Sequence, residues 1–295
     1  MLLLVAAFVS LGPDTLRELV SGLTFARPPA ASIAPAPLHT DPLLQARLEG
    51  VGAELSYGSL GLAVVDLHSG AMARVDAARA YPAASLFKLP ILLEVLTEEE
   101  AGRLDPERRL EIRPEDWTDG SGVLQARVGD QLPVRELTRL MIQDSDNIAA
   151  LVLLDVVGVP SVNQLAERLG LVSTRLVDHR AGEAGDHTTS AADMAHLLVG
   201  LATGQLVGQH VAEQALSLLE LKQSVAWLGD DLPFWVKVAH KWGDLPEARH
   251  DAGVVYTPRG SYAIAVLTEN SPPDEAATAI AHASRLAYDY LGNRP

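Results

Sequence analysis

The hydrophobic positions of the chain follow two spacings, and each spacing predicts a different kind of element. Apolar runs at residues 61–67 and 71–75 flank a His-Ser-Gly turn, which predicts a β-hairpin. Strand patterns return only near the other end of the chain, at residues 235–240, 252–256 and 262–268. Helical spacing occupies the remainder, at residues 43–55, 85–99, 134–143, 148–157, 162–169, 191–201 and 211–221, and a last helix opens at Ser271-Pro272 and ends at Gly292.

Strands at both ends of the chain with helices between them predict an α/β protein of the α+β type. We expect one antiparallel sheet, flanked by the N- and C-terminal helices and interrupted by an all-helical subdomain. The sheet subdomain takes residues 41–80 and 232–292, and the helical subdomain takes residues 81–231. A functional cleft is expected where the two subdomains meet.

The first 40 residues differ in composition from the rest of the chain. The apolar run at residues 1–12 is shorter than the roughly 20 residues that cross a bilayer, and it lacks a basic start. Residues 1–25 are therefore either a signal peptide or a buried N-terminal helix, and residues 26–40 are a Pro/Ala-rich linker. Folding is expected to start near Asp41. The signal-peptide interpretation predicts a secreted or periplasmic protein.

Charge and composition exclude several classes of partner and chemistry. The formal net charge is −15 at pH 7, which argues against nucleic acid, because nucleic-acid binding rests on cationic side chains. The chain has no cysteine, so it forms no disulfide, thiolate nucleophile or cysteine metal site. Its nine histidines form neither H-x-H nor H-E-x-x-H, so we expect no metal and no cofactor. No membrane span is expected, and we expect a monomer.

Ser85 and Lys88 stand three residues apart at the start of an apolar helical segment. Residues at this spacing share one helix face, so the hydroxyl and the amine would point the same way. The apolar neighbours of Lys88 would lower its pKa by desolvation, which favours a base. Pro90 predicts either an irregular first turn or a helix that starts close to this proline. Alone, the motif is weak, because two ordinary helix residues can show this spacing by chance.

Two further motifs follow along the chain. Ser145-Asp146-Asn147 lies between two helical segments, and His-Lys-Trp-Gly at residues 240–243 ends a strand. The order S-x-x-K, S-D-N, K-[TS]-G is that of the serine penicillin-recognising enzymes. The chain resembles the class A β-lactamase family and its relatives, the penicillin-binding proteins, over roughly residues 41–292.

The resemblance implies a role for each matching side chain. Ser85 would be the acylated nucleophile, and Lys88 would be its base or proton relay. Ser145 would pass a proton to the leaving nitrogen, Asn147 would hold the substrate amide, and Lys241 would attract the substrate carboxylate. A serine hydroxyl needs such a neighbouring base before it becomes a good nucleophile.

The third motif departs from the family pattern at one position. Gly243 would let the substrate approach the backbone, and the backbone N–H of Asp244 would join that of the nucleophile in the oxyanion hole. Trp242, however, replaces the hydroxyl residue of K-[TS]-G, so one hydrogen bond to a β-lactam carboxylate is missing. Arg249 or His250 could take over the binding of that carboxylate.

The loop between the second and third motifs departs further. Class A enzymes carry a Glu-x-x-Leu-Asn element there, whose glutamate activates the deacylating water. Residues 174–190 are shorter and lack the element, and their carboxylates are Asp178, Glu183 and Asp186. Glu183 is the candidate for a catalytic role, and the alternative is that all three are solvated loop charges.

We interpret the chain as a metal-independent serine hydrolase that forms an acyl-enzyme at Ser85. Its expected partner is a small-molecule β-lactam or a D-Ala-D-Ala-like compound, and hydrolysis of the β-lactam ring is the expected reaction. The alternatives are a penicillin-binding protein or sensor that deacylates slowly and a D-alanyl-D-alanine peptidase or esterase. Because no residue matches the missing glutamate, deacylation is expected to be the slow step.

Overall fold

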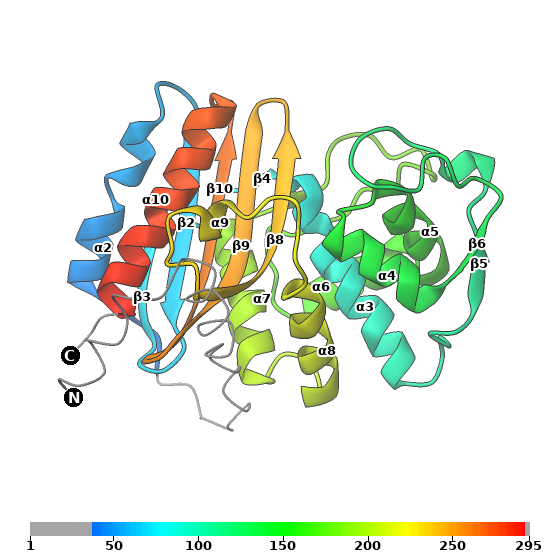
Figure 1. The fold of residues 1–295 in the computed structure, drawn as a ribbon, viewed down its shortest axis with the longest axis horizontal. Helices are drawn as coiled ribbons and strands as arrows, with labels where there is room; N and C mark the ends of the chain where they lie inside the picture. Colours follow the sequence, from blue (N-terminus) through cyan, green and yellow to red (C-terminus); the bar gives the residue numbers. More distant parts are fainter. Residues whose placement is uncertain (1–36, 293–295) are drawn as a thin grey trace, which may run out of the picture.

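The computed structural model describes residues 37–292 of the chain (Figure 1). The predicted N-terminal segment 1–25 and residues 26–36 of the predicted linker lie outside the described residues. Within the predicted linker, His39 and Thr40 form a short strand, β1. Asp41 then caps the first helix: the backbone N–H groups of Leu43 and Leu44 both donate to its Oδ1 at 3.0 Å.

One mixed but mainly antiparallel sheet organises the molecule, as predicted. Its strand order is β1-β3-β2-β10-β9-β8, and all neighbours run antiparallel except β1 and β3. The strands from the two ends of the chain meet at the pairing of β2 with β10, from Ser59 opposite Glu269 to Asp66 opposite Tyr262. The bounds of the five longer strands are β2 Ser59–Asp66, β3 Ala71–Val75, β8 Lys237–Leu245, β9 Ala248–Thr257 and β10 Gly260–Glu269.

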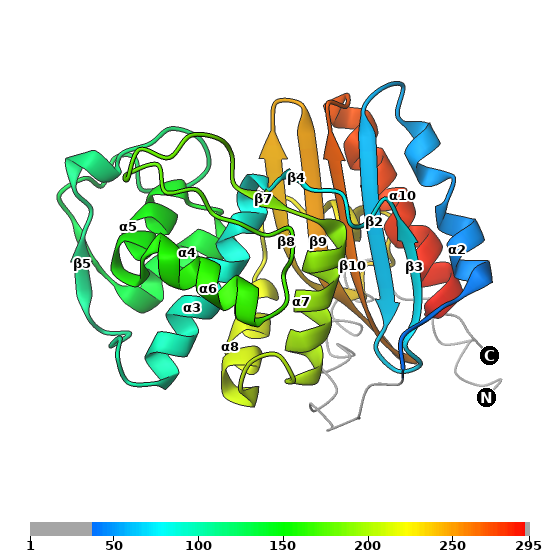
Figure 2. The same cartoon turned by 180° about the vertical axis from the view of Figure 1, so that it is seen from behind.

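Helices cover both faces of the sheet, which is why β2 and β10 are apolar along most of their length. Helices α2 (Pro42–Leu48) and α10 (Pro273–Leu291) lie on one face in Figure 1. The short helices η2 (Val51–Glu54) and α9 (Trp227–Asp230) complete this layer, and its core includes Leu62, Val64, Ile264 and Ile280. Helix α7 (Ala191–Thr203) crosses the other face, as Figure 2 shows.

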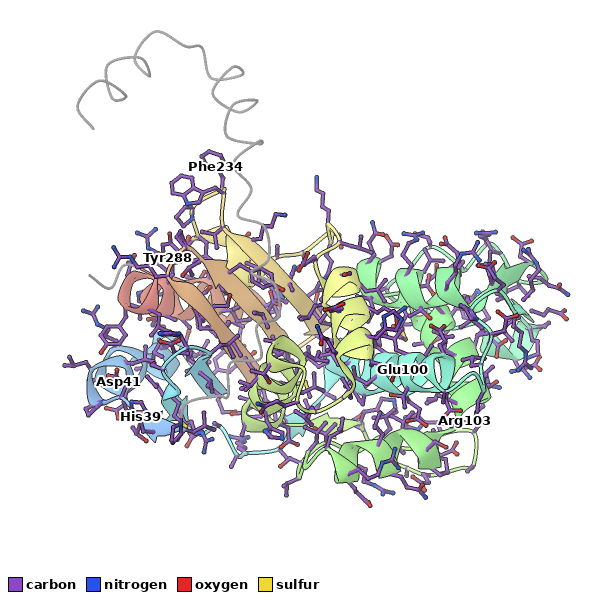
Figure 3. All side chains as sticks on the ribbon, turned by 90° about the horizontal axis from the view of Figure 1, so that it is seen from below. His39, Asp41, Glu100, Arg103, Phe234 and Tyr288 are labelled. Carbon is purple, nitrogen blue, oxygen red and sulfur yellow. The ribbon has the colours of Figure 1, made fainter. Side chains whose placement is uncertain are left out.

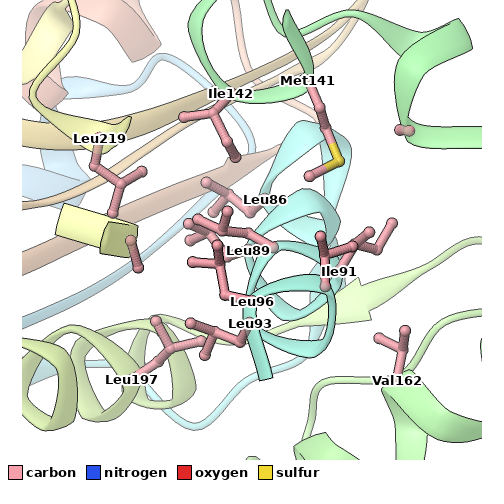
Figure 4. Packing of buried hydrophobic residues seen from close by; sticks show 14 of the residues in the cluster. Leu86, Leu89, Ile91, Leu93, Leu96, Met141, Ile142, Val162, Leu197 and Leu219 are labelled. Carbon is pink, nitrogen blue, oxygen red and sulfur yellow. The ribbon is translucent and has the colours of Figure 1, made fainter. Parts of the chain in front are cut away.

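The helical subdomain surrounds helix α3 (Lys88–Glu100), which is apolar on all sides and buried from Leu89 to Leu96. Leu89 and Leu93 share one core with Leu197 of α7 and Leu219 of α8 (Figure 4). The other helices of this subdomain are α4 Val134–Gln143, α5 Asn147–Val157, α6 Val159–Arg168 and α8 Gln209–Leu219. The last residue of the first motif, Lys88, is therefore the first residue of a single buried helix.

Several short elements were not predicted. The two-residue strands β4 (Tyr81–Pro82) and β7 (Thr188–Thr189) pair with each other. So do β5 (Arg109–Glu111) and β6 (Gln131–Pro133). Single 3₁₀ turns, η3 (Ala84–Phe87) and η4 (Pro114–Asp116), complete the described chain. The β4–β7 pair matters most for the site, because it joins the residues before Ser85 to the loop that the sequence analysis found shortened.

The outer surface shows how the two subdomains extend the molecule. In Figure 3 the labelled Glu100 and Arg103 lie in the helical subdomain, His39 and Asp41 lie near the opposite end of the molecule, and Phe234 projects from the segment before β8. Phe234 is 73% exposed. Within residues 37–292 no single helix has the length and apolar composition to cross a membrane; α5 and α6 meet that criterion only when joined across a bend of 84°.

Candidate active site

The turn that carries Ser85 is irregular, as Pro90 predicted. Ser85 lies in the 3₁₀ turn η3, and the α-helix begins only at Lys88, so Pro90 falls in its first turn, where backbone N–H groups have no helical partner. Ala84 has a φ of +43°, in the left-handed region that non-glycine residues seldom adopt. This strained backbone holds Ser85 at the junction of the two subdomains.

Lys88 is fully buried and lies at the centre of a cluster of oxygen atoms. Its Nζ is 3.0 Å from Ser85 Oγ and 3.1 Å from Ser145 Oγ. It also donates to the carbonyl oxygen of Ser145 at 2.5 Å and to Asn147 Oδ1 at 2.7 Å. Burial lowers the pKa of Lys88 to about 7, against the opposing charge of Asp146. A neutral amine within reach of the Ser85 hydroxyl can accept its proton near neutral pH.

Ser145 links the first and third motifs. Its hydroxyl lies 3.1 Å from Lys88 Nζ and accepts from Lys241 Nζ at 3.0 Å. The residue is buried and has a φ of +52°, a second strained position in the same site. One hydroxyl between two amines gives a continuous path for a proton.

Asp146 fixes the conformation of the second motif. It caps helix α5 by accepting from the N–H of Ala149 at 2.8 Å, and its other oxygen accepts from the N–H groups of Val123 and Leu124 at 2.6 and 3.0 Å. The chain passes so close that a Cβ on Gly122 would stand 2.2 Å from the carboxylate. Asp146 therefore fastens the loop that precedes α4 to the start of α5.

The side chain of Asn147 is held at both ends of its amide. Its Oδ1 accepts from Lys88, and its Nδ2 donates to the carbonyl oxygen of Asp119 at 3.1 Å. Its backbone N–H donates to the carbonyl oxygen of Ser121 at 3.0 Å. The amide is thus held in one orientation beside Lys88.

Strand β8 brings the third motif against the nucleophile turn. A Cβ on Gly243 would stand 2.9 Å from the Cβ of Ala84 and 3.0 Å from the backbone nitrogen of Ser85, so only glycine fits there. The next residue, Asp244, lines the same cleft as Ser85. The backbone of residues 243–244 therefore runs directly beside the backbone of the nucleophile.

Lys241 and Trp242 occupy the interior rather than the open cleft. Lys241 is fully buried, and its Nζ donates to Ser145 Oγ and to the carbonyl oxygen of Trp242 at 2.7 Å. Burial, together with the charge of Lys88, holds the pKa of Lys241 well below its ordinary value. The Trp242 indole packs edge-on against Trp227 at 6.2 Å, and its Nε1 has no hydrogen-bond partner among residues 37–292. The indole thus lies behind the strand.

The two residues expected to replace the missing carboxylate contact are engaged elsewhere. Arg249 donates to Asp244 Oδ1 at 3.2 Å and to the carbonyl oxygen of Pro273 at 2.8 Å. His250 is fully buried, and its Nε2 donates to the carbonyl oxygen of Pro82 at 2.7 Å. Neither is among the described residues that line the cleft, so their role in binding a carboxylate stays a prediction.

The cleft that contains Ser85 has a volume of about 380 Å³. Its walls come from the nucleophile turn, the loop before α4, the start of α5, the loop before β7 and the end of β8. They include Ser121, in the loop before α4. The residues that line it are Pro82, Ala83, Ala84, Ser85, Phe87, Thr118, Gly120, Ser121, Asn147, Leu151, His179, Asp186, His187, Asp244 and Leu245.

Glu183, the candidate for the deacylating base, does not reach this cleft. Its Oε2 accepts from the N–H of Asp178 at 3.1 Å and from Arg175 Nη2 at 3.4 Å, and its side chain is 46% exposed. The described residues on the cleft wall do not include it. Glu183 is therefore exposed and hydrogen-bonded within its own loop. Of the three loop carboxylates, only Asp186 lines the cleft.

Two histidines that the sequence analysis did not select lie on the cleft wall instead. His187 stacks at a tilt on Phe87, with ring centroids 4.4 Å apart, and His179 lies 5.3 Å from His187. Burial, with a smaller contribution from His179, lowers the pKa of His187 to about 4. No motif marks these residues, and only their position in the loop before β7 could have suggested them.

The loop that carries the histidines is anchored to the helical subdomain by buried charge. Asp116 is fully buried and accepts from Arg113 at 2.9 Å and from Arg180 at 2.5 Å. Burial raises the pKa of Asp116, but the hydrogen bonds from the two arginines outweigh it and lower the pKa below its ordinary value. Arg180 also pairs with Asp155 of α5 at 2.9 Å. Residues 178–187 are therefore held in place beside the nucleophile.

The described residues contain no group of three or more His, Asp or Glu side chains that could hold a metal ion. The constellation is instead one serine, two buried lysines and a second serine at the junction of a sheet with an inserted helical subdomain. This fold and this arrangement define the serine penicillin-recognising class. The model of the β-lactamase enzyme family matches residues 44–291, so the chain belongs to that family.

Solved structures of penicillin-binding proteins and β-lactamases are also similar to this chain. PBP-A is 27% identical and superposes with a TM-score of 0.81, covering 87% of this chain and 98% of its own. A variant of PBP-A, solved as an acyl-enzyme complex with penicillin G, is 28% identical, with a TM-score of 0.80 over 86% and 98% of the two chains. A β-lactamase from Sphaerobacter thermophilus is 28% identical, with a TM-score of 0.78 over 85% and 98%.

Proposed function

We propose that this protein is a serine hydrolase that is acylated at Ser85 by a β-lactam, and that water then releases the opened product. The observation that carries the proposal is the 3.0 Å distance from the buried Lys88 Nζ to the Oγ of Ser85, which lines the cleft. The pKa of Lys88, lowered by burial to about 7, supports its service as the base.

Acylation can be written through the described side chains. Neutral Lys88 takes the proton of Ser85 as its Oγ attacks the carbonyl carbon of the lactam, and the backbone N–H groups of Ser85 and Asp244 stabilise the oxyanion. The C–N bond of the ring then breaks as Ser145 protonates the leaving nitrogen. Ser145 recovers a proton from Lys88 or from Lys241, because its Oγ lies within 3.1 Å of both amines.

Substrate recognition uses the remaining matched residues. In the proposal Asn147 holds the side-chain amide of the substrate, Lys241 provides positive potential for its carboxylate, and Gly243 lets the substrate lie along β8. Trp242 offers no contact to the carboxylate, because its indole packs against Trp227. We therefore expect weaker carboxylate recognition than a hydroxyl residue at position 242 would provide.

A second candidate function is a penicillin-binding protein that deacylates slowly. It is favoured by the cleft wall, whose described residues include no glutamate. The similarity to PBP-A, one variant of which was captured as an acyl-enzyme with penicillin G, points in the same direction. A D-alanyl-D-alanine peptidase or esterase would use the same nucleophile on a different acyl donor.

One experiment distinguishes these functions. Purified protein is mixed with penicillin G, ring opening is followed by absorbance, and the mass of the intact protein is recorded over time. Turnover identifies a β-lactamase, a persistent adduct identifies a penicillin-binding protein, and neither result with penicillin G refutes both. Release of D-alanine from a D-Ala-D-Ala peptide is measured in parallel, and Ser85→Ala should give no adduct in any assay.

We also propose that the enzyme acts outside the cytoplasm and as a monomer. The support for export is the apolar run at residues 1–12, which lies outside the described residues. Fractionation of producing cells tests the first statement, and light scattering of the purified protein tests the second.

A further inference from the structure

Two histidines on the loop before β7 are held against the turn that carries the nucleophile. The carbonyl oxygen of His187 accepts from the N–H of Ala83 at 2.7 Å, two residues before Ser85. Its ring lies 4.4 Å from that of Phe87, two residues after Ser85. The histidine loop thus contacts the nucleophile turn on both sides of Ser85, and both His179 and His187 line the cleft.

The hydrogen bonds of His187 determine where its proton is. Its Nδ1 accepts from the backbone N–H of Val177 at 2.9 Å, so Nδ1 carries the lone pair. The pKa of about 4 keeps the ring neutral at physiological pH, and its single proton is therefore on Nε2. His187 is a fixed hydrogen-bond donor in the cleft wall.

The hydrogen bonds of His179 produce the opposite tautomer. Its Nδ1 lies 3.3 Å from the carbonyl oxygen of Glu183, and a carbonyl only accepts, so Nδ1 carries the proton. In this tautomer the lone pair is on Nε2. Two backbone hydrogen bonds close the turn at residues 178–183. The N–H of Glu183 donates to the carbonyl oxygen of Asp178 at 3.0 Å, and the N–H of Gly182 donates to the carbonyl oxygen of His179 at 3.2 Å. His179 is an oriented acceptor beside an oriented donor.

A second cavity adjoins the cleft at these rings. It has a volume of about 240 Å³ and shares Phe87, Leu151, His179 and His187 with the cleft wall. This space is large enough for water molecules and has polar groups to bind them. A water beside the acyl group would find a donor in His187 and a base in His179.

We propose that His179 is the general base of deacylation, an inference that rests on the acyl-enzyme function proposed above. The oxygen of a water, positioned by His187 Nε2–H, forms a bond to the carbonyl carbon of the Ser85 ester as His179 Nε2 takes one of its protons. The tetrahedral intermediate breaks its bond to Ser85 Oγ, which receives a proton from His179. The products are the free carboxylic acid and the original hydroxyl.

The other bases near the cleft are less suitably placed. Lys88 Nζ is surrounded by Ser85, Ser145 and Asn147. In the proposed mechanism this group of side chains transfers the proton during acylation. The carboxylates of Asp178 and Glu183 accept hydrogen bonds within their own loop. Asp186 lines the cleft and is exposed, so it is included in the test.

The test compares acylation with deacylation in the full chain. In His179→Ala, with penicillin G as the probe, the burst rate should stay within about twofold, and the lifetime of the acyl-enzyme should lengthen by about 10²–10⁴-fold. Added imidazole should shorten that lifetime in the variant by replacing the lost base. The matched control is His68→Ala, because His68 is exposed in the turn between β2 and β3. Asp186→Asn should leave the lifetime unchanged.

Several outcomes overturn the inference without affecting the proposed function. The first is an acyl-enzyme lifetime in His179→Ala equal to that of the wild-type protein, including the case in which the wild-type adduct is itself as long-lived as that of the variant. The second is a longer lifetime in His179→Ala that comes with an equal loss of burst rate and does not respond to imidazole. An effect confined to Asp186→Asn assigns the base to that carboxylate. If the wild-type protein forms no adduct and opens no ring, the proposed function itself has failed.

Discussion

Replacing Lys88 by methionine removes the amine while keeping most of the bulk of the side chain. With the ordinary lysine pKa of 10.5, roughly one molecule in 3,000 would carry a neutral amine at pH 7. With the lowered pKa of about 7, about half of the molecules do. Burial therefore increases the amount of available base on the order of 10³-fold, which is comparable to the usual contribution of a general base.

The expected result is a loss of acylation rate of about 10²–10⁴-fold in Lys88→Met, measured by stopped-flow absorbance with penicillin G. In the wild-type protein the acylation rate should rise about tenfold per pH unit below pH 7 and level off above it, because only the neutral amine accepts the proton. Lys222→Met is the matched control, because Lys222 is exposed on the surface, and it should change neither quantity.

The same pKa makes a separate prediction for stability. Because the folded pKa of Lys88 lies below the unfolded one, its contribution to the free energy of unfolding is smallest below pH 7 and increases as the pH rises toward 10.5. The total change is about 5 kcal/mol. Denaturant unfolding at pH 6 and pH 9.5 should therefore show a gain in the free energy of unfolding of the wild-type protein that Lys88→Met lacks.

A flat pH profile of the acylation rate between pH 6 and pH 9, or normal acylation by Lys88→Met, would refute the assignment of Lys88 as the base.

Four further changes test other parts of the site. Lys241→Ala should slow acylation by carboxylate-bearing β-lactams about tenfold more than acylation by an uncharged ester. Equal losses of the two acylation rates would mean that Lys241 has a structural role and does not bind the carboxylate. Trp242→Thr should lower the free energy of unfolding by about 3 kcal/mol, measured in urea, because the indole packs behind β8. Gly243→Ala should abolish the acylation burst, since its Cβ would stand 3.0 Å from the Ser85 nitrogen. Glu183→Gln should leave acyl-enzyme lifetime unchanged by mass spectrometry; a longer lifetime would return the base to that carboxylate.

The elements that the sequence predicted well are those whose side chains face one core. Helix α4 was predicted at residues 134–143 and is observed at Val134–Gln143, because its apolar side chains recur on a single face. Strand β3 was likewise predicted at its observed bounds, Ala71–Val75. The pair β4 and β7 escaped prediction, since strands of two residues have no periodicity and their pairing joins residues about 100 positions apart.

The same distinction holds in the site. The three motifs named Ser85, Lys88, Ser145, Asn147 and Lys241, and the structure brings these five residues together. Arg249 and Glu183 were chosen only because they lie near a motif or in a loop, and the structure commits both to other partners. His179 and His187 belong to no motif. They line the cleft only because of the path of their loop, and the sequence of residues 178–187 alone does not determine that path.

The two buried lysines explain how a proton can leave the site once it has been accepted. Lys88 and Lys241 both lie about 3 Å from Ser145 Oγ, and the charge of Lys88 lowers the pKa of Lys241. The repulsion is mutual, so a second positive charge in this buried pair is unfavourable. In the proposed acylation, when Lys88 takes the proton of Ser85, that repulsion would favour transfer of a proton through Ser145 to the leaving nitrogen. The proposed mechanism would therefore couple activation of Ser85 to protonation of the leaving group, which neither lysine alone would do.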